Sequence, residues 1–292
     1  MAEQDNKGEW RDFWGLLRCP QCNGNLVQDS NGVHCSVCQT HFPIDHNAIV
    51  FSQPPHAINP SEKRERGAGK DTHWRQANNH FLQTHLQQLP ENALILDVGA
   101  GRGDFLPYYQ HFPHILLDIY PYPEIDIVCD LITVNPFQAD CLDVVLLFNV
   151  LEHVQSPAAL LTSLWNVLKP GGKIFITIPF MLKVHQAPLD FQRLTHYALD
   201  ELAHQTGFNI ITIEGVYDPV GLIYEATRYY RFWTRPEQKR LTRLFSGVIL
   251  KTLSWHIGLL NLFSPKPYIQ SPFETNNPAP LGYQLILEKP SV

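Results

Sequence analysis

Short apolar runs alternate with amphipathic stretches from residue 73 to the end of the chain. Strands are predicted at residues 94–98, 115–119, 125–129, 143–148, 173–178, 210–213 and 283–287. Each run is of strand length, and the run at 143–148 is too continuously apolar to face water on either side, which is typical of a strand buried on both faces. Helices are predicted between them at residues 73–89, 156–168 and 195–207. Strands that alternate with helices indicate an α/β fold of the doubly wound type, with a mostly parallel, seven-stranded sheet.

The chain before residue 73 has a different pattern. Residues 14–54 lack a long apolar run and are rich in cysteine and turn residues, so they are predicted to form a small separate module. Residues 55–72 combine paired prolines, a charged run and two glycines, which is typical of a linker. Residues 73–292 would then form the main domain, with a largely helical insertion at about 218–280 before the last strand.

Four of the six cysteines lie in the N-terminal module. They are Cys19, Cys22, Cys35 and Cys38, and they form two Cys-x2-Cys turns. Each turn offers two thiolates on one tight loop, and four thiolates are a ligand set of structural zinc. Asn31-Gly32 between the turns is typical of a hairpin. The pattern predicts a zinc-ribbon-like module that holds a structural Zn²⁺, and four reduced cysteines without metal are the alternative.

The residues around these cysteines resemble a known family. Leu17–Leu26, followed by His41–Asp45, is similar to the Trm112-like zinc-binding family. The similarity covers the N-terminal module alone, and His46-Asn47-Ala48 stands where that family usually has a glycine-containing turn. The resemblance implies a zinc-binding segment and leaves open what the segment contacts.

A glycine-rich loop directly follows the first strand of the main domain, in the run Asp97-Val-Gly-Ala-Gly-Arg-Gly-Asp104. Glycines let the backbone turn sharply and let a ligand approach it closely. The spacing Gly-x-Gly-x-Gly differs from the Gly-x-Gly-x-x-Gly of dinucleotide-binding loops. Asp97 would repel a pyrophosphate but attract a cationic amino group, which disfavours a nicotinamide-dependent oxidoreductase. Asp118 ends the second strand, where a ribose-binding carboxylate is expected.

With Leu168-Lys-Pro-Gly-Gly-Lys173, these residues resemble the class I S-adenosylmethionine-dependent methyltransferases of the type-11-like group. The resemblance covers about residues 73–208 and implies a Rossmann-like sheet with S-adenosyl-L-methionine as the cofactor. It also implies a set of cofactor-binding residues. These are Asp97, Gly99, Gly101 and Gly103 around the methionine part, Asp118 at the ribose, Asp130 and Leu131 at the adenine, and Asn149 near the sulfonium. For Asp130, a helix-capping role is the alternative.

The acceptor side is sought in the run from His185 to Thr195, which lies beyond the carboxyl end of the sheet. It resembles, more loosely, a feature of bacterial methyltransferases of cell-surface polysaccharide or lipid-linked sugar pathways. His185 is the candidate general base, and Asp190 the candidate group that orients it or binds a hydroxyl. The alternative is a local Asp190–Arg193 pair. His153 is a further candidate, and a packed or solvated histidine is its alternative.

Net charge and composition limit the partners. The chain has a net charge of −6 and no N-terminal apolar run or long apolar stretch, so a cytoplasmic protein is expected. The predicted substrate is a small-molecule or lipid-linked acceptor, such as a sugar or cell-surface precursor. An RNA methyltransferase is a rival, because some methyltransferases of ribosomal RNA combine a zinc module with this fold. A non-catalytic partner subunit that binds the cofactor is another, because the Trm112-like family includes such subunits.

Residues 228–263 mix basic and aromatic side chains and continue with apolar residues at helical spacing. Such a mixture favours peripheral contact with an anionic membrane surface, here the inner leaflet. A helical cap over the acceptor pocket and an RNA-binding patch are the alternatives.

Overall fold

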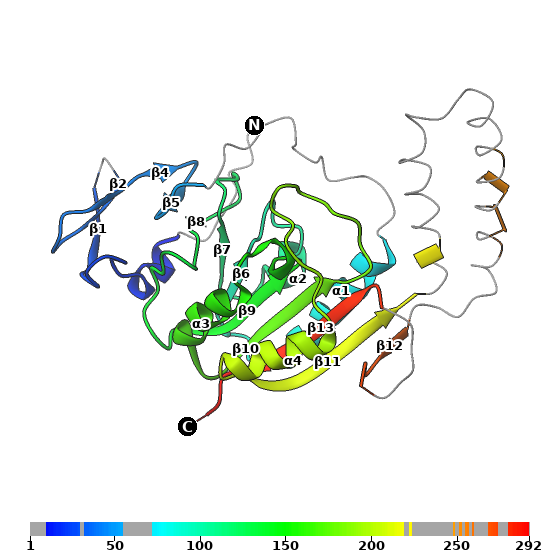
Figure 1. Ribbon diagram of the computed structural model, residues 1–292. Helices are drawn as coiled ribbons and strands as arrows, with labels where there is room; N and C mark the ends of the chain where they lie inside the picture. Colours follow the sequence, from blue (N-terminus) through cyan, green and yellow to red (C-terminus); the bar gives the residue numbers. More distant parts are fainter. Residues whose placement is uncertain are drawn as a thin grey trace.

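The computed structural model describes residues 10–29, 32–54, 72–218, 268–273 and 280–291, and a few single positions between 222 and 259. One ten-stranded sheet runs through the molecule in the order β12-β11-β13-β10-β9-β6-β7-β8-β5-β4 (Figure 1). A second, three-stranded sheet, in the order β1-β2-β3, belongs to the N-terminal segment. Helices lie on both faces of the large sheet, so the α/β, doubly wound architecture predicted from the sequence is present.

The centre of the sheet is parallel. Its strands are β6 (Ile95–Val98), β7 (His114–Asp118), β8 (Ile127–Val128), β9 (Leu142–Phe148) and β10 (Leu168–Pro179). These are the first five strands predicted from the apolar runs. Their carboxyl ends lie at one edge of the sheet, which is where open α/β sheets bind ligands.

The far side of the sheet is antiparallel. β13 (Gly282–Glu288) lies between β10 and β11 (Asn209–Tyr217) and is antiparallel to both. β12 (Tyr268–Gln270) adds a further antiparallel strand next to β11. All seven predicted strands are therefore found, in a sheet that is mixed and larger than predicted.

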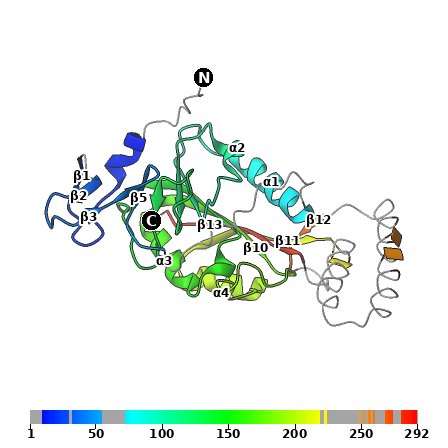
Figure 2. The ribbon, with the colours of Figure 1, turned by 90° about the horizontal axis from the view of Figure 1, so that it is seen from above.

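Two helix layers sandwich the sheet, as Figure 2 shows: α1 (His73–Leu86) and α2 (Leu106–Tyr109) cover one face, and α3 (Pro157–Val167) and α4 (His196–Gln205) the other. Alternate residues of β9 serve the two layers. Leu146 packs in the core under α1, whereas Val145 packs in the core under α3. Because both faces of this strand are covered, its apolar run is continuous and does not alternate.

The N-terminal segment is joined to the large sheet. It comprises the 3-10 helix η1 (Trp10–Leu16) and strands β1 (Leu26–Asp29), β2 (Gly32–Cys35), β3 (His41–Phe42), β4 (Ile44–Asp45) and β5 (Ala48–Val50). β1 and β2 form the hairpin that Asn31-Gly32 predicts. β5 pairs in parallel with β8, through Ile49–Ile127 and Val50–Val128. Strands β5 and β4 thus extend the main sheet, a continuity that the apolar pattern did not predict.

Several predictions from the sequence lie outside the described residues. The linker at 55–72 is described only at Thr72, and the insertion at 218–280 only in β12 and scattered positions. The membrane-contact hypothesis for residues 228–263 falls largely in this part of the chain. Among the residues that the structure describes, no helix is both long and apolar enough to cross a membrane.

Candidate functional site

The glycine loop after β6 has a backbone that requires glycine. Gly99, Gly101 and Gly103 have φ angles of 72°, 56° and 67°, in the left-handed region that disfavours side chains. A Cβ built on Gly99 would lie 2.6 Å from Val150 Cγ2, whereas a Cβ on Gly101 would meet nothing within 4 Å. Gly101 therefore borders open space at the carboxyl edge of the sheet, where a ligand can approach the main chain.

Two buried carboxylates lie beneath this loop, at the ends of adjacent strands. Asp97 in β6 is 3% exposed and accepts a hydrogen bond from the Tyr109 hydroxyl. Burial raises the pKa of Asp97 to about 7. Asp118 in β7 is 7% exposed, and burial raises its pKa to about 6. Both acids thus ionise near neutral pH, which suits groups that pair with a cationic or polar ligand.

Asp118 is also tied to the loop itself. Its Oδ2 accepts from the backbone N–H of Gly101 at 2.9 Å, and its Oδ1 accepts from that of Tyr120 at 3.0 Å. The backbone of Ile119 is a third donor to this carboxylate, which has about four lone-pair sites, so one remains for a ligand hydroxyl. The predicted ribose carboxylate and the predicted glycine loop are therefore one connected unit.

The two residues predicted to flank the adenine lie at the end of β8. Asp130 is partly exposed, and its Oδ1 accepts from the N–H of Ile132 at 3.0 Å, which is a local turn-capping contact. Its own N–H donates to Ser52 Oγ of the N-terminal segment at 2.8 Å. Leu131 is 3% exposed and packs in the core. Little of the Leu131 side chain is left to touch a ligand in this conformation.

Asn149 follows β9 directly and has an unusual backbone. Its φ is 56°, a conformation that non-glycine residues adopt rarely and often at functional sites. The indole Nε1–H of Trp74 donates to Asn149 Oδ1 at 2.9 Å. Helix α1 thus fixes the side chain that was predicted to lie near the sulfonium.

A second cluster lies one turn further along the chain, in the 3-10 helix η3 (Leu151–His153) and the loop before α4. His185 Nδ1 lies 3.3 Å from Asp190 Oδ2, a contact through which Asp190 can orient His185. Asp190 also pairs with Arg193 through contacts of 2.6 and 2.9 Å, which is the local alternative. These hydrogen bonds hold the pKa of Asp190 well below its usual range. The structure contains both arrangements at once.

Glu152 and His153 complete this cluster. Glu152 is fully buried, and burial raises its pKa to about 8. Its Oε1 lies 3.7 Å from His153 Nε2 and 3.9 Å from His185 Nε2. Burial lowers the pKa of His153, whose ring packs edge-on against that of His185 at a centroid distance of 4.7 Å. Glu152, His153 and His185 therefore meet at the same edge of the sheet as the glycine loop.

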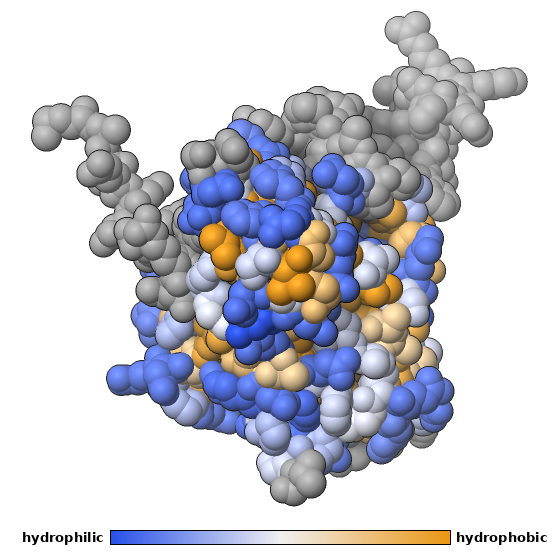
Figure 3. Space-filling view, turned by 90° about the vertical axis from the view of Figure 1, so that its left-hand side faces the viewer, coloured by the Kyte–Doolittle hydropathy of each residue, from blue (hydrophilic) through white to orange (hydrophobic). Residues whose placement is uncertain are grey.

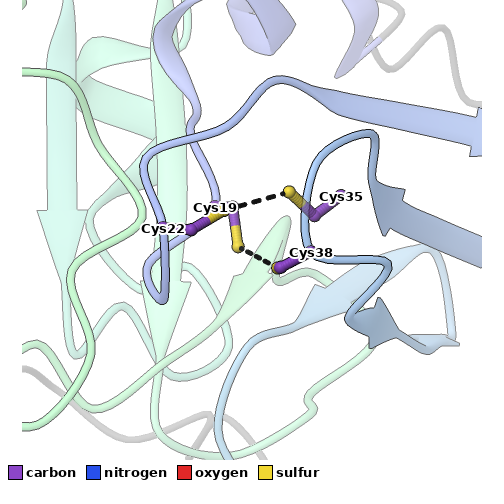
Figure 4. Close-up of side chains that lie close together, drawn as sticks. All are labelled: Cys19, Cys22, Cys35 and Cys38. Atoms are coloured by element: carbon purple, nitrogen blue, oxygen red, sulfur yellow. Dashed lines mark hydrogen bonds between the residues drawn. The ribbon is translucent and has the colours of Figure 1, made fainter.

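The four clustered cysteines come from two turns, Cys19 and Cys22 between η1 and β1 and Cys35 and Cys38 at the end of β2, and they lie close together (Figure 4). Cys19 Sγ lies 3.6 Å from Cys38 Sγ, and Cys22 Sγ lies 3.4 Å from Cys35 Sγ. Sulfurs about 2.3 Å from a tetrahedral metal are about 3.8 Å apart, so small adjustments complete such a site. All four are free thiols, and hydrogen bonds from the side chain and backbone of Thr40 lower the pKa of Cys38 to about 6. The donor set fits Zn²⁺.

The cysteine-rich N-terminal segment packs its apolar side chains inward. Cys19 and Cys35 are fully buried and share a core cluster with Leu17 of the same segment and with Ile127 and other residues of the large sheet. The face of the molecule on this side is mostly hydrophilic, with small separate hydrophobic patches (Figure 3). The cysteine site therefore lies in a segment that is itself part of the main core.

Residues 71–216 match the family model described as a methyltransferase domain. This span is half of the 292-residue chain, and the chain belongs to this family. The methyltransferase class predicted from the glycine loop is confirmed. The family model does not extend over the cysteine-rich segment.

A probable S-adenosylmethionine-dependent methyltransferase of Mycolicibacterium smegmatis is 28% identical to the chain over 107 residues, which are 35% of this chain and 42% of that protein. The chain thus matches less than half of this curated relative. A SAM-dependent methyltransferase structure from Archaeoglobus fulgidus is 17% identical, with 74% of this chain and 94% of that chain covered and a TM-score of 0.44. The 1,6-didemethyltoxoflavin-N1-methyltransferase of Burkholderia thailandensis is 16% identical, with coverages of 76% and 80% and a TM-score of 0.46.

Three site residues were not predicted from the sequence. Tyr109 of α2 donates a hydrogen bond to Asp97, and Trp74 of α1 donates one to Asn149. The third residue, Glu152, lies between His153 and His185. A charged residue four positions after the end of a buried strand was a usable signal for Glu152. Tyr109 and Trp74 carry no such signal, because their partners are defined by helix packing.

Proposed function

We propose that this chain transfers the methyl group of S-adenosylmethionine to an acceptor. The observation that carries this proposal is the connected unit of the glycine loop, Asp97 and Asp118. The loop offers main-chain groups beside open space at Gly101, and the two acids suit the amino group and the ribose hydroxyls of that cofactor. The membership in the methyltransferase-domain family supports the same conclusion.

In this proposal the cofactor supplies an electrophilic methyl group and a good leaving group. The residues of the chain position it and exclude water from the reaction. Asn149 at the end of β9, held by Trp74, would define the position of the reacting end of the cofactor.

We further propose that the acceptor carries a hydroxyl, as a sugar or lipid-linked cell-surface precursor does. A hydroxyl must lose its proton as it is methylated, and Glu152, His153 and His185 offer groups for this step beside the sheet edge. The Cys19, Cys22, Cys35 and Cys38 site would hold a structural Zn²⁺ away from this chemistry, because a four-thiolate site has no open coordination position.

Calorimetry with S-adenosylhomocysteine tests the cofactor assignment. We expect binding by the wild type and an affinity about 10- to 100-fold lower for Asp118→Ala, because charged hydrogen bonds are lost. Asp200→Ala, which changes a partly exposed acid on α4, is the matched control and should bind normally. Tight binding of NADH in place of S-adenosylhomocysteine, or normal binding by Asp118→Ala, would refute the proposal. Transfer of a labelled methyl group to fractionated cell extract then identifies the acceptor class.

A further inference from the structure

Three potential metal ligands converge at the carboxyl edge of the sheet, outside the cysteine site. Glu152 and His153 come from η3 after β9, and His185 comes from the loop between β10 and α4. One atom from each of these side chains lies within 4.8 Å of the other two. The Glu152 Oε1 distances of 3.7 and 3.9 Å to the two Nε2 atoms are too long for hydrogen bonds. Ligands about 2.1 Å from one metal ion are roughly 3.0–3.4 Å apart, so a small contraction would suffice for these two pairs.

Buried polar atoms are left without partners at this point. Among the described residues, neither carboxylate oxygen of Glu152 has a hydrogen-bond partner, although the residue is fully buried. The buried Nε2 of His153 also has none. Unsatisfied buried groups of this kind are costly, and in native proteins they commonly mark an ion or a water that completes the site. The nearby Arg193 is engaged by Asp190.

In each of the two histidines, the hydrogen bond made by Nδ1 determines whether Nε2 carries a proton. His153 Nδ1 lies 2.5 Å from the carbonyl oxygen of Leu189, which can only accept, so the proton of the ring is on Nδ1. His185 Nδ1 lies 3.3 Å from the carboxylate of Asp190, and this contact selects the same tautomer. In the neutral ring Nε2 is then an acceptor, and both Nε2 atoms face the carboxylate of Glu152. Three acceptors facing one another repel unless a cation, either a metal ion or a proton, lies between them.

We propose that Glu152, His153 and His185 bind one divalent transition-metal ion of the Zn²⁺ class. Two imidazoles and a carboxylate are a ligand set of such metals rather than of Mg²⁺ or Ca²⁺. The contacts of the two Nδ1 atoms with a carboxylate and a backbone carbonyl match the outer contacts that orient metal-bound histidines. Three protein ligands leave a coordination position open.

The location of this metal site indicates a role in activating the acceptor, an inference that rests on the proposed function. Glu152 lies three residues after Asn149, at the edge where the cofactor is expected. A hydroxyl bound at the open position loses its proton more readily, because the metal stabilises the alkoxide. The oxygen then bonds to the methyl carbon, the carbon–sulfur bond breaks with its electron pair staying on sulfur, and the hydroxyl proton leaves to water. In this mechanism the bound metal, and not His185 as a general base, would activate the acceptor hydroxyl.

Titration of metal-depleted protein with Co²⁺ tests the site separately from the cysteines. Cobalt bound to thiolates shows intense sulfur-to-metal charge-transfer absorption in the near ultraviolet, whereas cobalt on nitrogen and oxygen shows only weak visible bands. We expect the wild type to bind a cobalt equivalent without thiolate absorption in addition to the thiolate-bound one. Glu152→Gln, which keeps the shape of the side chain, and His185→Ala should each lose the former and keep the latter.

The exposed His204 of α4 provides a matched control, since His204→Ala should retain both equivalents. Retention of the thiolate absorption shows that a variant is folded around its cysteine site. A wild type that binds cobalt only through thiolates would overturn the proposal, as would a Glu152→Gln variant that keeps the nitrogen–oxygen equivalent. S-adenosylhomocysteine affinity of the same metal-depleted wild type reports separately on the proposed function, because the cofactor residues lie outside the metal ligands.

Discussion

Alanine at Gly101 should separate cofactor binding from folding. Its φ of 56° lies in the left-handed region, where a non-glycine residue costs about 1–2 kcal/mol. The new methyl group meets no protein atom within 4 Å, so no steric cost is added. The free energy of unfolding should therefore fall by only about 1–2 kcal/mol. The same methyl group would occupy the space in which the cofactor approaches the main chain.

Alanine at Gly99 provides the comparison, because there a steric cost is added to the backbone cost. It has a similar φ, but a methyl group there would lie 2.6 Å from Val150 Cγ2. Overpacking of this kind typically costs a further 1–3 kcal/mol or so, which gives a total of roughly 2–5 kcal/mol for Gly99→Ala. Val150→Ala in the Gly99→Ala background removes the colliding atom and should recover much of the steric part.

Urea unfolding and calorimetry with S-adenosylhomocysteine measure the two effects. Gly101→Ala should unfold close to the wild type yet bind the ligand at least about tenfold more weakly, a loss of about 1.4 kcal/mol. Wild-type affinity in Gly101→Ala would refute the assignment of the open space at Gly101 to the cofactor. A loss of stability in Gly101→Ala as large as that in Gly99→Ala would refute the steric argument.

Three further predictions concern the remaining parts of the site. Burial raises the pKa of Asp97 to about 7, so its carboxylate is protonated as the pH falls below that value. The affinity for S-adenosylhomocysteine should therefore drop about tenfold between pH 8 and pH 6. Asp97→Asn should bind weakly at both pH values. Elemental analysis should find zinc on the four clustered cysteines, and Cys19→Ser or Cys35→Ser should lose it and melt at a lower temperature, since both side chains are buried; stoichiometric zinc in both variants would exclude this site. Trp74→Phe removes the donor to Asn149 and should lower methyl-transfer turnover more than melting temperature, and unchanged turnover would show that this hydrogen bond has no part in catalysis.

The sequence by itself determined the strands, the loop and the cysteine cluster. Val145 and Leu146 pack against opposite helix layers, so β9 must be apolar on both faces. The resulting continuous apolar run can be recognised in the sequence alone. The positive φ angles of Gly99 and Gly101 likewise demand glycine at a defined spacing after a strand. These features are local, because each depends on residues that are neighbours in the chain.

Only the tertiary structure decided which distant segments meet. Ile49 lies in an apolar run that is too short to predict which strand it pairs with. It pairs with Ile127 because β8 has an open edge in the sheet. Glu152 reads in the sequence as one acid in a short helix, and it becomes the centre of a cluster because the loop before α4 folds back and places His185 against it. Such contacts depend on loop paths and sheet edges, which are set by the packing of the whole domain and leave no periodic pattern in the chain.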